Sequence, residues 1–91
     1  MPQSRKIKIS SRAQRDFKKL KNEIKDRIKT SLKEIASDRE NLDIKKLKGV
    51  HGRGDLYRLR VGDYRIVYFP TDDEILVIRI DKRSKVYKFL D

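Results

Sequence analysis

The sequence predicts an α+β fold in the order β-α-α-β-β-β, with a helical hairpin packed on a small, mainly antiparallel, twisted sheet. Three observations predict this fold. The length of 91 residues suits one compact domain spanning residues 1–91. Apolar and polar residues alternate near the N-terminus and again after residue 55, as they do in half-buried strands. Between these stretches, apolar residues recur at helical spacing.

The first half of the chain supplies one strand and both helices. Ile7 and Ile9 alternate with charged residues, which predicts a short strand. Ser11 and Gln14 match a capping box at the start of a first helix, which we expect to end near residues 21–22. Asn22 is expected to cap a second helix. The apolar residues of the two helices are Ala13, Phe17 and Leu20, then Ile24, Ile28, Leu32, Ile35 and Ala36.

The second half supplies three strands. Residues 44–54 are basic and contain three glycines, which predicts a loop. Residues 56–61 and 64–69 alternate, and Gly62-Asp63 between them predicts a type II′ hairpin turn. Residues 75–80 are so apolar that we expect a central strand. The connections are too short for crossover helices, so these strands should be antiparallel. The tail, residues 81–91, fits either a last strand or a frayed helical turn.

Composition limits the classes of function. Lys and Arg number 25 against 14 Asp and Glu, which gives a net charge of +11. Such a charge favours polyanionic partners: nucleic acid first, then an acidic protein, then an anionic membrane surface. The absence of Cys excludes disulfide scaffolds, thiolate zinc sites and cysteine nucleophiles. No apolar run reaches the roughly 18 residues of a membrane span, so we expect a soluble cytoplasmic protein with no membrane partner.

The basic residues gather in two segments. Residues 45–65 hold seven basic residues against two acidic ones, and the tail adds more. Arg58 and Arg60 either join this tail in a basic concavity or merely project from the solvent side of their strand. Arg65 should share a face with Val67 and Phe69, so we expect it to be partly desolvated and to have an anionic partner.

Tyrosines are interleaved with the basic residues, at positions 57, 64, 68 and 87. Such rings can stack on the bases of single-stranded RNA. For Tyr64 and Tyr68, packing in the sheet is the favoured interpretation. Tyr87 lies among the basic residues of the tail and has less core to join.

Few enzyme chemistries remain open. His51 is the only histidine and lies beside glycines, which favours an exposed loop position. Asp72, Asp73 and Glu74 lie in one turn and are typical of a solvated hairpin tip, so we expect no metal site and no cofactor. RNA cleavage by its own 2′-hydroxyl suits a site rich in cations, because cations stabilise the anionic phosphorane. Close cations can also lower the pKa of a tyrosine from about 10 to about 7, which takes about 4 kcal/mol.

Three stretches of the sequence together resemble the RelE toxins of the RelE/ParE superfamily. They are Lys46-Leu47-Lys48-Gly49, the stretch from Leu56 to Tyr68, and the tail with Lys82, Arg83 and Tyr87. The resemblance implies the toxin of a type II toxin–antitoxin system, a metal-independent endoribonuclease that enters the A site of the 30S ribosomal subunit and cleaves mRNA there. It also implies an acidic, RelB-like antitoxin that wraps the toxin, in a heterotetramer or a larger complex.

The resemblance also assigns roles to residues. Arg65, Arg83 and Tyr87 match catalytic positions: scissile-phosphate stabilisation, help to the transition state or leaving group, and the general base. Arg58, Arg60 and Lys82 match contacts to RNA, and we include Lys46 and Lys48 among these contacts. Two alternatives remain: a non-catalytic RNA- or DNA-binding module using the same surface, and a ParE-like toxin that acts on DNA gyrase.

Overall fold

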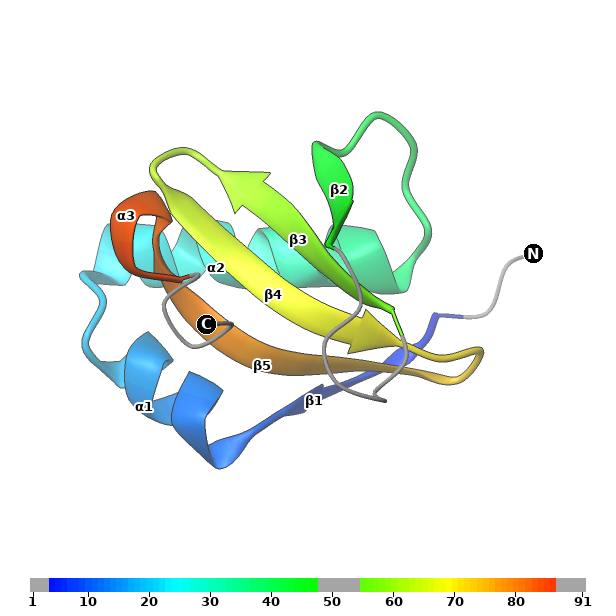
Figure 1. Ribbon diagram of the computed structural model, residues 1–91, viewed down its shortest axis with the longest axis horizontal. Helices are drawn as coiled ribbons and strands as arrows, with labels where there is room; N and C mark the ends of the chain where they lie inside the picture. Colours follow the sequence, from blue (N-terminus) through cyan, green and yellow to red (C-terminus); the bar gives the residue numbers. More distant parts are fainter. Residues whose placement is uncertain (1–3, 48–54, 87–91) are drawn as a thin grey trace.

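The computed structural model describes residues 4–47 and 55–86 (Figure 1). Its elements, in chain order, are β1 (Lys6–Ile9), α1 (Ser11–Lys18), α2 (Asn22–Ala36), β2 (Ile44–Leu47), β3 (Leu56–Val61), β4 (Tyr64–Pro70), β5 (Glu74–Lys82) and α3 (Arg83–Val86). The predicted α+β class is confirmed. Two elements add to the predicted order. The start of the glycine-containing segment forms a strand, β2, where we expected a loop, and the tail begins with the helical turn α3.

The described strands form one five-stranded sheet in the order β1-β5-β4-β3-β2. Strand β1 runs parallel to β5, and every other neighbouring pair is antiparallel. The sheet is therefore mainly antiparallel, as predicted. The apolar strand β5 lies between β1 and β4, which confirms its predicted central position (Figure 1).

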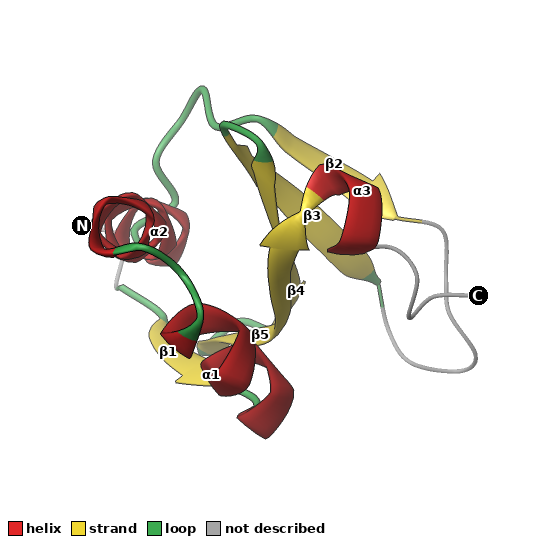
Figure 2. Cartoon of the chain, turned by 90° about the vertical axis from the view of Figure 1, so that its left-hand side faces the viewer, coloured by secondary structure: helices red, strands yellow, loops and turns green. Residues whose placement is uncertain are grey.

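The core lies between the sheet and α2, on one face of the sheet, while α3 lies on the opposite face (Figure 2). Ile28, Leu32 and Ile35 of α2 are buried there against the sheet. The strand residues of this core are Leu59, Val61, Ile66, Tyr68, Ile75, Val77 and Ile80. A smaller apolar cluster around Leu56 and Val67 lies on the other face of the sheet, with Phe69 packed against it.

The helices begin one residue away from the predicted caps. Ser10, not Ser11, caps α1, because its hydroxyl accepts the Ala13 N–H at 3.1 Å. Gln14 donates its side-chain amide to the Ile9 carbonyl. Helix α2 has Lys21 at its N-cap position without a side-chain hydrogen bond, so Asn22 is its first residue rather than its cap. Lys21 is thereby placed at the α1–α2 connection, and its side chain is exposed.

A buried ion pair fixes α1 to the end of β5. Asp16 accepts hydrogen bonds from Arg79 Nε at 2.9 Å and from the Ile80 N–H at 3.0 Å, both at Oδ2. Arg79 also donates to Asp81 at 3.3 Å. A β-bulge between β4 and β5 makes Val67 pair with Arg79 while Tyr68 pairs with Val77. This arrangement sets the direction in which β5 delivers the residues that follow, Lys82 and Arg83.

None of the helices within residues 4–47 and 55–86 is long and apolar enough to cross a membrane.

Candidate functional site

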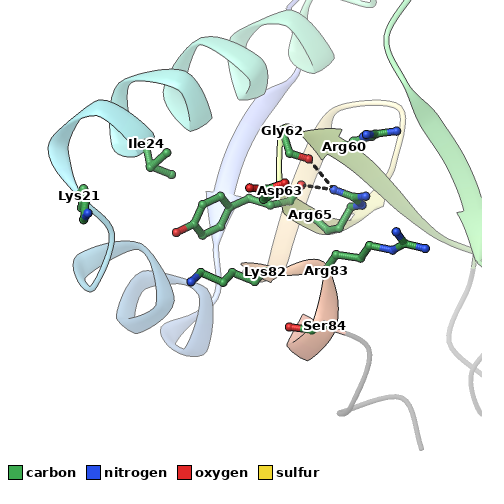
Figure 3. A pocket seen from close by; sticks show the side chains of 10 residues that line it. Lys21, Ile24, Arg60, Gly62, Asp63, Arg65, Lys82, Arg83 and Ser84 are labelled. Atoms are coloured by element: carbon green, nitrogen blue, oxygen red, sulfur yellow. Dashed lines mark hydrogen bonds between the residues drawn. The ribbon is translucent and has the colours of Figure 1, made fainter.

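A cavity of about 780 Å³ opens where the β3–β4 hairpin, the end of β5 and the start of α2 meet (Figure 3). Among the described residues, five cationic side chains and one carboxylate, that of Asp63, line it. The cations are Lys21, Arg60, Arg65, Lys82 and Arg83. Four of them, Arg60, Arg65, Lys82 and Arg83, were identified from the sequence as site residues, and they come from four different elements, β3, β4, β5 and α3.

The hairpin turn brings Arg83 to this cavity. Gly62 has a φ of +59°, and the only non-glycine residues with positive φ in the described chain are Asp38 and Asn41, so Asp63 has negative φ. These values agree with the predicted type II′ turn. The Arg83 N–H donates to the Asp63 carbonyl at 3.0 Å, which ties the first residue of α3 to the tip of the hairpin.

Arg65 is the most buried of the described cations that line the cavity. It is only 7% exposed, so the predicted desolvation is confirmed. Nη1 donates to the carbonyls of Gly62 at 2.8 Å and Tyr64 at 2.9 Å (Figure 3). No carboxylate of the described residues forms an ion pair with Arg65, so its anionic partner, for which a phosphate would serve, stays a prediction. Within the described chain, Nε and Nη2 make no hydrogen bond and are not sealed from solvent. These donors are therefore available to a phosphate.

Asp43, which precedes β2, binds Arg58 and lies near Arg60. Arg58 Nη1 donates to the Asp43 carbonyl at 3.0 Å and to its carboxylate at 2.9 Å, whereas Arg60 Nη1 lies 3.9 Å from the same carboxylate. The Arg58 hydrogen bond and the charges of Arg58, Arg60 and Arg65 lower the pKa of Asp43 against a weaker opposing effect of burial. These three arginines therefore act as one positive field on this side of the sheet.

Arg58 and Arg60 consequently differ in what they can contact. The Arg58 side chain is 17% exposed and binds the segment around Asp43 to β3. Neither interpretation left open from the sequence, a basic concavity shared with the tail or projection from the solvent side of the strand, includes this contact. Arg60 is exposed and lines the cavity.

Lys82 lies on a different side of the hairpin from the arginines. In Figure 3 its side chain extends toward Lys21, while those of Arg65 and Arg83 extend the other way. The register explains this: Lys82 pairs with Tyr64, whereas Asp81 pairs with Arg65, so the two pairs occupy opposite faces of the β4–β5 ladder. Lys82, a predicted RNA contact, and Arg83, a predicted catalytic residue, thus line the same cavity from opposite sides.

The remaining predicted residues lie away from the cavity or outside the description. Lys46 is on β2 and forms an ion pair with Asp55 at 3.2 Å. Lys48, His51 and Tyr87 fall outside the described residues.

Two of the tyrosines are packing residues. Tyr57 and Tyr68 stack with ring centroids 6.0 Å apart, and burial raises the pKa of Tyr68 to about 12. This confirms the predicted packing role of Tyr68. Tyr64 also packs against the core, but it lines the cavity as well.

The sequence did not indicate Lys21 or Ile24 of the α2 region as site residues. From the sequence, Lys21 is expected only near the start of the second helix, and Ile24 is expected only to contact the core. No local pattern tells that the start of α2 lies beside the hairpin tip.

Possible metal ligands are dispersed. Among the described residues no group of three or more His, Cys, Asp or Glu side chains is placed to hold a metal ion. Asp72 and Asp73 are exposed in the β4–β5 turn, as the sequence predicted, whereas Glu74 is the first residue of β5 and forms an ion pair with Lys8 at 3.0 Å.

Comparisons with known proteins place this architecture in one family. The model of the "ParE toxin of type II toxin-antitoxin system" family matches residues 7–87. Toxin RelE3 of Methanocaldococcus jannaschii is 35% identical over 79 residues, which cover 82% of this chain and 86% of the relative.

Solved structures agree. The RelB–RelE complex of Methanococcus jannaschii contains a chain that is 31% identical, with a TM-score of 0.72, over 92% of this chain and 99% of that one. The RelE–RelB complex of Pyrococcus horikoshii OT3 gives 28% identity and a TM-score of 0.68, over 91% and 99%. The chain therefore belongs to the RelE/ParE family and is a RelE-like toxin of a type II toxin–antitoxin system.

Proposed function

We propose that this protein inhibits translation by cutting mRNA in the A site of the ribosome. One observation carries the proposal: Arg60, Arg65 and Arg83, from β3, β4 and α3, line a single cavity. Guanidinium groups recognise phosphate by paired, charge-assisted hydrogen bonds, and a cluster of them stabilises charge that develops on a phosphorus centre.

The chemistry uses the nucleophile that RNA carries. The 2′-oxygen forms a bond to the adjacent phosphorus while its proton passes to a general base, and the bond from phosphorus to the 5′-oxygen breaks as that oxygen receives a proton. The products are a 2′,3′-cyclic phosphate and a 5′-hydroxyl end. Arg65 and Arg83 stabilise the phosphorane in this scheme. Because charge stabilisation comes from side chains, the step requires no metal ion.

Tyr87 is our candidate for the general base, and it lies outside the described residues. Tyr68 is unsuited to this role, because it lies in the core and its pKa of about 12 opposes deprotonation near neutral pH.

An acidic RelB-like antitoxin is the proposed partner, in a heterotetramer or a larger complex. Two observations support it: the similar chains of known structure are complexes of RelE with RelB, and the net charge of +11 favours an acidic protein. The proposed site of action is the cytoplasm, where ribosomes are found.

The test is to add the purified protein to ribosomes stalled with an empty A site and to map the ends of the mRNA. We expect cuts within the A-site codon that leave 5′-hydroxyl ends. Arg83→Ala changes an exposed residue and should slow cutting by about 100-fold or more. Arg65→Lys keeps the charge without the planar fork and should also be slow. Lys33→Ala removes an exposed cation from the far end of α2 and serves as the control. Cutting by both arginine variants at the control rate would contradict the proposal.

A second function has a specific observation in its favour, because the matching family model is that of the ParE toxins. A toxin acting on gyrase would leave the mRNA whole and produce DNA breaks when mixed with gyrase and plasmid. Tight binding to programmed ribosomes with neither product would instead indicate a non-catalytic binding module.

A further inference from the structure

We propose that the part of the cavity between α2 and β4 binds an unpaired base of the RNA together with its phosphate. This tyrosine side of the cavity consists of Lys21, Ile24, Tyr64 and Lys82. The inference rests on the proposed function and adds a base-binding subsite beside the arginines that hold the scissile phosphate.

Strand geometry separates the tyrosine side from the arginines. Tyr64 and Lys82 are register partners in the antiparallel β4–β5 pair, so their side chains emerge next to each other on one face. Arg65, the next residue along β4, points to the other face. Figure 3 shows the result: Lys21, Ile24 and Lys82 lie on one side of the hairpin end, and Arg60, Arg65 and Arg83 on the other.

The tyrosine side combines an apolar wall with cations. Ile24 and Tyr64 are each half-buried: they pack against the core and also line the cavity. Lys21 and Lys82 are exposed, and within the described chain no carboxylate forms an ion pair with either ammonium group.

This combination matches the chemistry of a nucleotide. An aromatic ring beside an aliphatic side chain receives the face of a base, and ammonium groups at the edge receive its phosphate. An acidic peptide would use the two lysines but has no need of the aromatic wall. The observations therefore favour a single-stranded nucleic acid over an acidic protein segment.

The tyrosine side and the three arginines line one cavity of about 780 Å³. Cavities of this volume hold ligands larger than a single base. A single strand can therefore place its scissile phosphate on the arginines and an adjoining nucleotide against Tyr64. Of the residues that the structure describes, Asp63 at the hairpin tip is the one that places a carboxylate along this path.

The test compares two RNA probes by fluorescence anisotropy: a short oligouridylate and the same ribose-phosphate chain with every base removed. The wild-type protein should prefer the probe with bases by about 10-fold, within the range of one base–aromatic stack. Tyr64→Phe should keep this preference, because the ring remains, and Tyr64→Leu should lower it at least 5-fold. Phe17→Leu, which changes a half-buried aromatic residue on α1, should keep it.

The lysines have their own readout. Lys21→Gln and Lys82→Gln should each reduce the slope of log binding constant against log salt by about one, since each removes one phosphate contact. Lys33→Gln should leave that slope unchanged.

A crosslink in the wild-type protein keeps the test independent of folding in the variants. An oligouridylate carrying thiouridine should crosslink to Tyr64 or Ile24 on irradiation. Crosslinks confined to Arg60, Arg65 and Arg83 would overturn the inference. So would a Tyr64→Leu variant that is folded and keeps the full preference for bases. A protein that prefers the probe with bases but does not cleave mRNA would overturn the proposed function and support the base-binding subsite. A protein that cleaves mRNA but shows no preference for bases would overturn the subsite and support the proposed function.

Discussion

Arg60 and Arg65 face each other directly across the antiparallel β3–β4 pair. Like charges at such a position destabilise a sheet. The local charge arrangement therefore weakens the folded state and suits an anion placed between the two guanidinium groups.

Replacing Arg60 with an uncharged residue should stabilise the folded protein at low salt. We expect Arg60→Gln to raise the free energy of unfolding by up to about 1 kcal/mol at low salt, because the repulsion with Arg65 is removed. The loss of its weak contact to Asp43 should matter little, since exposed ion pairs contribute little. Urea unfolding at low and high salt measures the effect, which should shrink as salt screens the repulsion. Arg60→Lys is the control that keeps the charge; a Gln variant less stable than the Lys variant at low salt would contradict the prediction.

Asp43 should make stability depend on pH in the acid range. Its pKa in the folded protein lies below the unfolded value of about 3.9, so its stabilising effect is complete above that value and is lost as pH falls through the lowered pKa. We expect the urea midpoint of Asp43→Asn to be below that of the wild type at neutral pH and to converge with it in acid. Asp26→Asn, on the exposed face of α2, is the matched control. A midpoint difference that stays constant down to about pH 2 would refute this.

Gly62 should tolerate no side chain without cost. Gly62→Ala forces a residue with a Cβ into φ +59° and should cost about 1–2 kcal/mol in urea unfolding. The new Cβ would also meet Arg27 Nη2 at 3.1 Å, but that group is the far end of a flexible side chain and can move. The penalty should therefore persist in an Arg27→Ala background, and Gly62→Asn should cost less than Gly62→Ala. If Arg27→Ala abolished the penalty, the close contact and not the backbone conformation would be its cause.

Removing the Asp16 carboxylate should weaken the contact between α1 and β5. Asp16→Ala takes one partner from a buried ion pair, which costs about 3–5 kcal/mol; we expect the lower end, since Arg79 keeps its bond to Asp81. Hydrogen exchange at the Ile80 amide gives a local measurement, because that N–H donates to Asp16. It should exchange faster in Asp16→Ala than in an Asp26→Ala control. Unchanged protection of Ile80 would show that this carboxylate does not hold the end of β5.

The sequence was informative where a local pattern decides the structure. Alternation located β3 and β4 and placed Arg65 on a buried face, and the glycine identified the turn at residues 62–63. Strand β2 was missed because three of its four residues are exposed and its order comes from pairing with β3, a contact that no local pattern encodes.

The arrangement of the site depended on features distant in sequence. Whether Lys82 joins Arg83 or lies with Tyr64 is set by the β4–β5 register, and a bulge shifts that register. The buried Arg65 donates to backbone carbonyls of its own hairpin. The residue pattern predicts that Arg65 is buried, but it does not show whether the acceptor is a carbonyl or a carboxylate. Lys21 entered the site through the packing of α2 on the sheet.

The parallel pairing of β1 with β5 places Lys6 beside Glu74 and so connects segments that lie far apart in the sequence. A nascent chain released before residue 74 would have its two helices but no central strand for them to cover. Arg83 follows directly after that strand, so the cationic hollow assembles only when translation has passed it. A product that ends before residue 74 thus lacks both the central strand of the core and two of the cations that line the cavity, Lys82 and Arg83.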